Sequence, residues 1–170
     1  MNDFSMDASF DRVVSIEMFE HMRNYELLLN RVADWLKPEG KLYIHIFSHK
    51  TLVYPFTEKG EGDWMGRNFF SGGIMPSHQL LLYFQDDLRI ESSWRVSGTH
   101  YERTSLAWIN KMDSRKNEIM KFFYESYGKD QASIWFQRWR IFFMSCEVLF
   151  GYDSGREWGV SHYRFVKPGN

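Results

Sequence analysis

The sequence predicts an α/β fold in which a partly parallel sheet carries a two-helix insertion between its last two strands. Two apolar runs, at residues 13–16 and 42–47, have the hydrophobicity on both faces that a buried parallel strand requires. A helical pattern lies between them, as in a strand–helix–strand unit. Farther along, two long amphipathic helical patterns separate two more predicted strands, so we expect the helices to form a lid on an α/β sheet.

The first elements can be justified in order. Residues 13–16 form the first strand, and residues 24–36 form a helix that ends before the turn signal Pro38-Glu39-Gly40. The apolar residues of that helix share one face: Tyr25, Leu28, Leu29, Val32 and Leu36.

The middle of the chain has weaker patterns. Residues 42–47 form the second buried strand, and residues 53–63 are polar and turn-rich, which predicts a loop over the ligand crevice. Pro76-Ser77 can start a helix that continues to Phe84. Residues 88–96 alternate between apolar and polar, as a half-buried strand does.

The last third of the chain is helical until its final strand. Residues 104–127 form one helix that ends at Gly128, and Asp130 caps a second long helix that closes at Gly151. Residues 158–166 form the last strand. We therefore expect one partial domain, with residues 1–100 and 158–167 as the sheet half and residues 101–157 as the helical lid insertion.

Composition excludes several classes of function. A net charge of −1 provides no basic field for nucleic acid or anionic lipid, and there is no long apolar run for a membrane span. The single cysteine, Cys146, permits no internal disulfide, so we expect a cytoplasmic protein. The aromatic content of 18% predicts an aromatic core, part of which can wall a pocket for a flat or greasy substrate.

Two motif-like patterns predict no binding site. Gly60, Gly62 and Gly66 are one residue off the dinucleotide-binding spacing, and no buried strand leads into them. His45 and His49 are four apart, which brings ligands together on a helix but not at a strand end. We therefore expect a loop in the first case and no metal in the second.

The most informative residues come directly after the first strand. Glu17, Glu20 and His21 follow the apolar run at 13–16, and the carboxyl ends of strands face the ligand crevice in open α/β sheets. Two carboxylates and an imidazole there can move protons near neutral pH. An acidic helix start is the structural alternative, but the Glu-His pair directly after an apolar strand favours catalysis.

This segment, Glu-Met-Phe-Glu-His-Met at residues 17–22, resembles the cyclopropane fatty acid synthase / coclaurine N-methyltransferase family, which uses S-adenosylmethionine. Its spelling is closest to the plant alkaloid N-methyltransferases. Further matching segments cover nearly the whole chain in the same order, at residues 45–51, 69–77, 80–86, 100–101, 139–143 and 149–152. The resemblance implies the C-terminal part of a Rossmann-like class I methyltransferase sheet.

The resemblance also implies roles for individual residues. In the N-methyltransferases, the positions matching Glu20 and His21 form a base dyad, and Glu17 contacts the substrate amine. The positions matching Trp139 and Phe142 wall the substrate pocket. The resemblance therefore predicts N-methylation of a small amine, with S-adenosylmethionine as the methyl donor.

A second reading of the resemblance is a lipid-modifying cyclopropane-fatty-acyl-phospholipid synthase. There, the residues matching Glu20, His45 and Tyr101 hold a bicarbonate that takes a proton from the substrate cation, and Phe47 belongs to the same pocket. The chain retains these residues but has Glu17 where those enzymes commonly have a small residue.

The family's glycine-rich cofactor turn has no counterpart in this sequence, so Met1 and Asn2 would supply only the edge of the adenine pocket. We therefore expect a fragment that lacks the N-terminal cofactor-binding half, or a piece completed by a partner chain. A non-catalytic fragment or partner subunit is the third hypothesis.

Overall fold

The computed structural model describes residues 4 and 6–169, which form two compact units. The first unit contains the described residues up to Val96 and those from Val160 onward, and the second runs from Ser97 to Gly159. Met1 and Asn2, predicted to touch the cofactor, lie outside the described residues.

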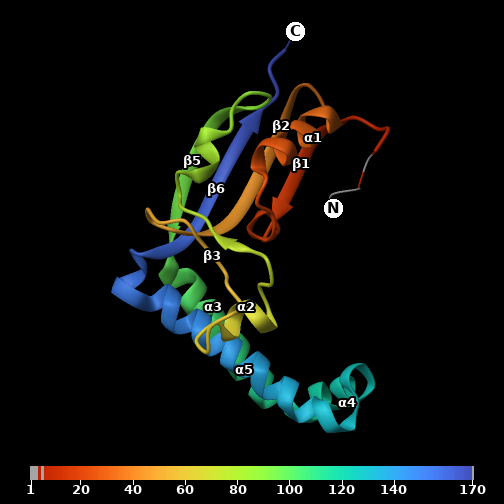
Figure 1. Ribbon diagram of the computed structural model, residues 1–170, viewed down its shortest axis with the longest axis vertical. Coiled ribbons are helices and arrows are strands. Elements are labelled where there is room, and N and C mark those ends of the chain that lie inside the picture. The colour runs from red at the N-terminus through yellow and green to blue at the C-terminus, as the bar shows by residue number, and fades with distance from the viewer. Residues whose placement is uncertain (1–3, 5, 170) are drawn as a thin grey trace. The chain divides into compact units, whose positions relative to one another are not determined.

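The first unit is built on a four-stranded sheet in the order β1-β2-β6-β5 (Figure 1). Its strands are β1 (Phe10–Ile16), β2 (Leu36–His49), β5 (Arg89–Ser97) and β6 (Trp158–Val166). β1 and β2 are adjacent and parallel, with Val13 opposite Leu42, as the sequence predicts. The predicted Rossmann-like arrangement is confirmed in this part of the sheet.

The other two strands run antiparallel to their neighbours. Lys167 N donates to Gly40 O over 2.9 Å, and the hydroxyls of Ser48 and Ser161 are 2.5 Å apart, so β6 and β2 run in opposite directions. Glu91 pairs with Arg164, and Trp94 stacks on His162, so β5 and β6 also run in opposite directions. β6 is therefore antiparallel to both β2 and β5.

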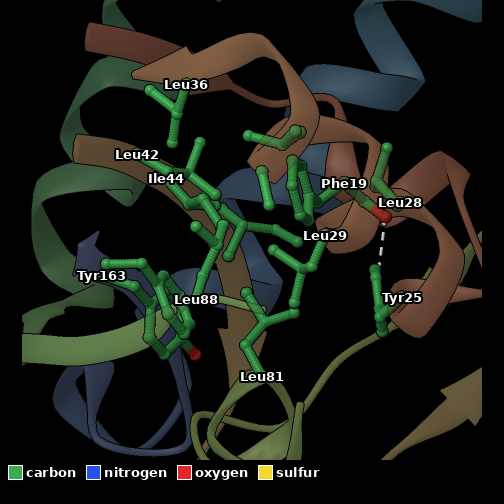
Figure 2. Packing of buried hydrophobic residues seen from close by; sticks show 14 of the residues in the cluster. Phe19, Tyr25, Leu28, Leu29, Leu36, Leu42, Ile44, Leu81, Leu88 and Tyr163 are labelled. Atoms are coloured by element: carbon green, nitrogen blue, oxygen red, sulfur yellow. Dashed lines mark hydrogen bonds between the residues drawn. The ribbon is translucent and has the colours of Figure 1, made fainter. Parts of the chain in front are cut away.

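Helix α1 (Tyr25–Trp35) covers one face of this sheet and forms the main core with it (Figure 2). Asn24 caps the helix, because its side-chain oxygen accepts from Leu27 N over 3.0 Å. The buried face of α1 consists of Tyr25, Leu28, Leu29, Val32 and Ala33, and it meets buried residues of β2 such as Leu42 and Ile44. Each such aliphatic side chain contributes about 1.5–3 kcal/mol by leaving water.

The prediction that β1 is buried on both faces is wrong for this chain. β1 is an edge strand of the described sheet, and Val14 and Ile16 are 62% and 61% exposed. Only the face that carries Val13 and Ser15 turns toward the core. The apolar run resembles a doubly covered strand, but α1 covers one face only, and β2 pairs with one edge only.

Two local predictions in the first unit also need correction. The helix expected from Pro76 to Phe84 is reduced to a 3-10 turn, η2 (Leu80–Tyr83). Gln85 ends this turn by donating its side-chain amide to Leu82 O over 2.8 Å. The loop expected at residues 53–63 contains β3 (Tyr54–Pro55), which pairs antiparallel with β4 (Ile74–Met75), and is followed by the short helix α2 (Trp64–Asn68).

The second unit is helical and has its own small core. Its elements are α3 (Gly98–Ser114), α4 (Lys116–Tyr127), α5 (Lys129–Gly151) and the turn η3 (Tyr152–Gly155). α5 packs along both α3 and α4 (Figure 1). The buried core residues are Met112, Met120, Phe123, Ala132 and Phe136.

The helical insertion has one more helix than predicted. The first predicted helix begins at Gly98 instead of Thr104, because Ser97 accepts from Thr99 N and caps it. The helix breaks at Arg115, whose ψ of 21° leaves the helical path. Gly128, with φ of 80°, ends α4 as predicted, but α5 starts one residue before Asp130.

None of the described helices has the length and apolarity needed to cross a membrane.

Candidate active site

The segment after β1 forms a tight turn that places three titratable side chains close together. Glu17 has a positive φ of 50°, and its N–H donates to His45 O on β2 over 3.0 Å. The turn η1 (Phe19–His21) follows at once and is held by Tyr25, whose hydroxyl donates to Phe19 O over 3.0 Å. The strand end, the turn and α1 therefore fix the geometry of this segment.

Glu20 and His21 are neighbours with opposite exposure. The Glu20 side chain is 2% exposed, whereas that of His21 is 46% exposed, and His21 Nε2 lies 3.7 Å from Glu20 Oε1. This distance is longer than a hydrogen bond but suits an ion pair when the imidazole is protonated. Glu20 Oε2 is buried and has no hydrogen-bond partner among the described residues.

Burial sets the proton affinity of Glu20. It raises the pKa of Glu20 to about 8, and the negative charge of Glu17 adds to the rise. At neutral pH the buried carboxyl therefore holds a proton, unlike an ordinary glutamate. A carboxyl with this pKa, beside a half-exposed imidazole, is the kind of pair that can exchange protons at physiological pH.

Glu17 forms a second contact across the sheet. Glu17 Oε1 lies 3.0 Å from His45 Nδ1, and both side chains are less than a third exposed. The distance suits an ion pair, although the angle is not that of a hydrogen bond. Burial lowers the pKa of His45, so the imidazole is neutral over most of the physiological range.

An aromatic wall adjoins the turn. The ring of His21 stacks on Phe70 at 5.8 Å, and Phe70 stacks on Phe56 at 4.9 Å. Phe47, predicted as a pocket residue, is buried and packs edge-on against Phe70 at 5.6 Å. The loop that carries Phe70 lies close to η1, since a Cβ on Gly73 would come within 2.9 Å of a backbone oxygen of the turn.

The sequence did not single out Phe56 and Phe70 as functional residues. Phe70 lies in residues 69–77, a segment that matches the family. The Phe-Phe-Ser-Gly-Gly run there could have indicated a tight loop that carries an aromatic residue. Phe56 gave no such signal, because its place depends on the pairing of β3 with β4.

Basic residues line a separate cavity on another side of His21. Its volume is about 320 Å³, and Arg23, Arg31 and Trp35 contribute to its wall. Arg23 is fixed by donating to Gly72 O over 2.8 Å. Two guanidinium groups disfavour a cationic amine there, so the carboxylate of Glu17 is the group suited to an ammonium.

The remaining predicted site residues belong to the second unit. Trp139 and Phe142, with ring centroids 5.6 Å apart, line a largely apolar cavity of about 650 Å³ together with Trp108 and Phe143. Tyr101 packs against Phe150 at 4.4 Å. That these residues converge with Glu20, His21 and His45 on one cavity stays a prediction.

In the described part of the chain, no group of three His, Cys, Asp or Glu side chains is placed to hold a metal ion. Gly66 packs within its own loop, because a Cβ there would lie 2.1 Å from Thr57 O.

Comparison with known proteins identifies the family. Residues 1–156 match the family described as mycolic acid cyclopropane synthetase. The chain belongs to this family. It is 37% identical over 166 residues to (S)-coclaurine N-methyltransferase of Thalictrum flavum subsp. glaucum, covering 95% of this chain and 46% of that protein. The cyclopropane-fatty-acyl-phospholipid synthase of Escherichia coli is 27% identical over 126 residues, which is 73% of this chain and 32% of that protein.

Solved structures agree with this assignment. A coclaurine N-methyltransferase bound to N-methylheliamine and SAH superposes with a TM-score of 0.89 at 36% identity, over 97% of this chain and 48% of that one. A cyclopropane synthase from Mycobacterium tuberculosis shares the fold, with a TM-score of 0.74 at 20% identity over 95% of this chain and 57% of that one. The chain spans about half the length of the curated relatives it matches.

Proposed function

We propose that this chain provides the acceptor-side half of an S-adenosylmethionine-dependent N-methyltransferase that acts on a small, flat amine. The carrying observation is the turn after β1, where the buried Glu20, with a pKa of about 8, lies beside the half-exposed His21. The coclaurine N-methyltransferases support this proposal, because they match 95% or more of the chain.

The turn has the groups that amine methylation needs. The sulfonium donor supplies an already activated methyl group, so the chain's residues have to bind the amine and remove its proton. Glu17 holds the ammonium form by charge, at the end of β1. His21 has Nε2 turned toward Glu20, which leaves Nδ1 to take the amine proton. The imidazolium that results favours the ionised form of Glu20, so the buried carboxyl releases its proton and pairs with His21.

The described residues do not provide a site for the methyl donor. Among them we find no glycine-rich turn between a buried strand and a helix, and Gly60 and Gly66 lie against Asp63 and Thr57 of their own loop. We propose that a partner chain supplies the residues that bind the donor. A cytoplasmic location, supported by the single buried cysteine, belongs to the same proposal.

The substrate class follows from the apolar cavity of the second unit. Trp139 and Phe142 line a space of about 650 Å³, which suits a ring system of alkaloid size and whose lining also includes Lys111, Arg115 and Glu118. The net charge of −1 gives the chain no overall positive field that would attract nucleic acid. We therefore propose a small-molecule amine as the partner of this site.

A lipid-modifying cyclopropane synthase is the second candidate. Glu20 and His45 are both present in the first unit, as the bicarbonate site of those enzymes would require, and the Escherichia coli relative supports this reading. However, His45 Nδ1 lies 3.0 Å from the Glu17 carboxylate, which would repel a bicarbonate. This contact favours the amine reading.

Complementation tests the proposal. The chain is co-expressed with the part of the Thalictrum flavum coclaurine N-methyltransferase that it does not match, and methyl transfer to coclaurine is measured with labelled S-adenosylmethionine. We expect transfer only when both parts are present. His21→Ala should slow transfer by about 10²-fold or more, the usual scale of general acid–base help.

The matched control is His100→Ala, which removes an exposed histidine of α3 and should leave the rate unchanged. Calorimetric titration of the chain alone should show weak or no binding of S-adenosylmethionine. Equal rates for His21→Ala and the unsubstituted chain would contradict the base assignment. Methylation of a lipid double bond instead of the amine would favour the cyclopropane synthase reading.

A further inference from the structure

A continuous row of side chains crosses β5, β6 and β2 on the sheet face that α1 does not cover, and it reaches the residue that follows β1. Trp94 of β5 stacks flat on His162 of β6, with centroids 5.1 Å apart and an interplanar angle of 2°. The Tyr43 hydroxyl of β2 lies 2.6 Å from His162 Nδ1. His162 meets His45 edge-on at 4.9 Å, and His45 reaches Glu17 at 3.0 Å.

The contacts leave His162 little freedom. Trp94 fixes the plane of the imidazole, and the Tyr43 hydroxyl fixes its rotation within that plane. If the phenol donates to Nδ1, the proton of the neutral imidazole lies on Nε2. Burial lowers the pKa of His162, and the charge of His45 lowers it further, so both imidazoles of the row favour the neutral form.

The far end of the row is the amine-binding carboxylate of the proposed function. Glu17 has a positive φ of 50°, a backbone conformation that is unfavourable for a residue other than glycine. Its N–H donates to His45 O on β2, and its carboxylate Oε1 lies 3.0 Å from His45 Nδ1. Backbone strain held in place by its surroundings is typical of functional positions.

We propose that Tyr43, His162 and Trp94 act through His45 as positioning residues for the Glu17 carboxylate. This inference rests on the proposed function for the role of Glu17 in binding the substrate ammonium. The row keeps the carboxylate at the carboxyl end of β1 in one orientation, so that the amine meets a preorganised counter-charge.

Other charged groups near the row do not replace these contacts. Glu20 lies on the turn after Glu17 and interacts with it through charge. Lys41, Glu91 and Arg164 form a separate ion-pair group, in which Lys41 Nζ is 2.6 Å from Glu91 Oε1. That group is paired within itself, whereas the row includes the 3.0 Å contact with Glu17.

Histidine titration by NMR tests the row in the 170-residue chain without any need for activity. The midpoints of His45 and His162 and the carboxyl ¹³C signal of Glu17 are followed with pH in the chain and in two variants. Glu17→Gln should lower the His45 midpoint by about 0.5 pH unit or more, because a carboxylate favours the imidazolium. Tyr43→Phe should change the tautomer signal of His162 and also shift the His45 midpoint and the Glu17 signal.

Tyr83→Phe is the matched control, since Tyr83 is 78% exposed and lies outside the row. Its three signals should equal those of the unsubstituted chain. If Tyr43→Phe leaves the His45 midpoint and the Glu17 signal as unchanged as the control does, the positioning role is refuted. A chain that fails in methyl transfer but shows the coupled shifts would refute only the proposed function.

Discussion

Buried Glu20 makes the stability of the chain depend on pH in an unusual direction. Its folded pKa of about 8 is well above the ordinary value of 4.5, so between these two pH values the folded chain holds a proton that the unfolded chain has released. Stability therefore falls as the pH rises through this range. Glu20→Gln, which has nearly the same shape and no titration, should remove this fall.

The magnitude follows from the width of the pH window. Each pH unit in which the folded state alone holds the proton costs about 1.4 kcal/mol, so the change from pH 5 to pH 8 is about 4 kcal/mol. This is an upper limit, because local relaxation and water entry reduce the cost of the buried charge. Domains are stable by about 5–15 kcal/mol, so the effect is large enough to measure.

Urea unfolding at pH 5 and pH 8 provides the assay. With an m-value of about 2 kcal/mol per M, the midpoint difference between the chain and Glu20→Gln should change by up to about 2 M between the two pH values. The lowered pKa values of His45, His78 and His162 make the fold less stable at low pH, so they act in the opposite direction to Glu20. Their contribution is the same in both variants and cancels when the two midpoints are subtracted.

Glu26→Gln controls for the loss of an acidic side chain, because Glu26 is exposed in the first turn of α1. Its midpoints should follow those of the unsubstituted chain at both pH values. If the midpoint of Glu20→Gln shifts between pH 5 and pH 8 by as much as that of the unsubstituted chain, Glu20 is ionised in the fold. The conclusion that the buried carboxyl holds a proton at neutral pH would then be wrong.

Two further substitutions test the packing. Tyr25→Phe removes the 3.0 Å hydrogen bond to Phe19 O and should lower the free energy of unfolding by about 1–3 kcal/mol, measured by urea unfolding; no loss would show that the bond does not hold η1. Gly98→Ala brings a Cβ within 2.3 Å of two backbone oxygens of the second unit, and overpacking should cost about 3 kcal/mol or more. Gly62→Ala, where a Cβ meets nothing within 4 Å, is the control, and equal thermal midpoints for both variants would contradict this reasoning.

The sequence by itself determined the features that depend on neighbouring residues. The apolar face of α1 and the bounds of β6 follow from local periodicity, and β6 spans the predicted residues 158–166. The position of Glu17, Glu20 and His21 directly after a strand is equally local, and so is the end of α4 at Gly128. These signals are contained within a few turns or strand residues.

Only the tertiary structure decided the features that depend on distant segments. Glu20 is buried because α1 and the loop carrying Gly73 pack around its turn, and this burial raises its pKa. His162 reaches Tyr43 across 119 residues of sequence. Val14 is exposed because nothing in the described chain covers its face of β1. Periodicity shows which face of a strand is apolar, whereas burial and proton affinity depend on what packs against that face.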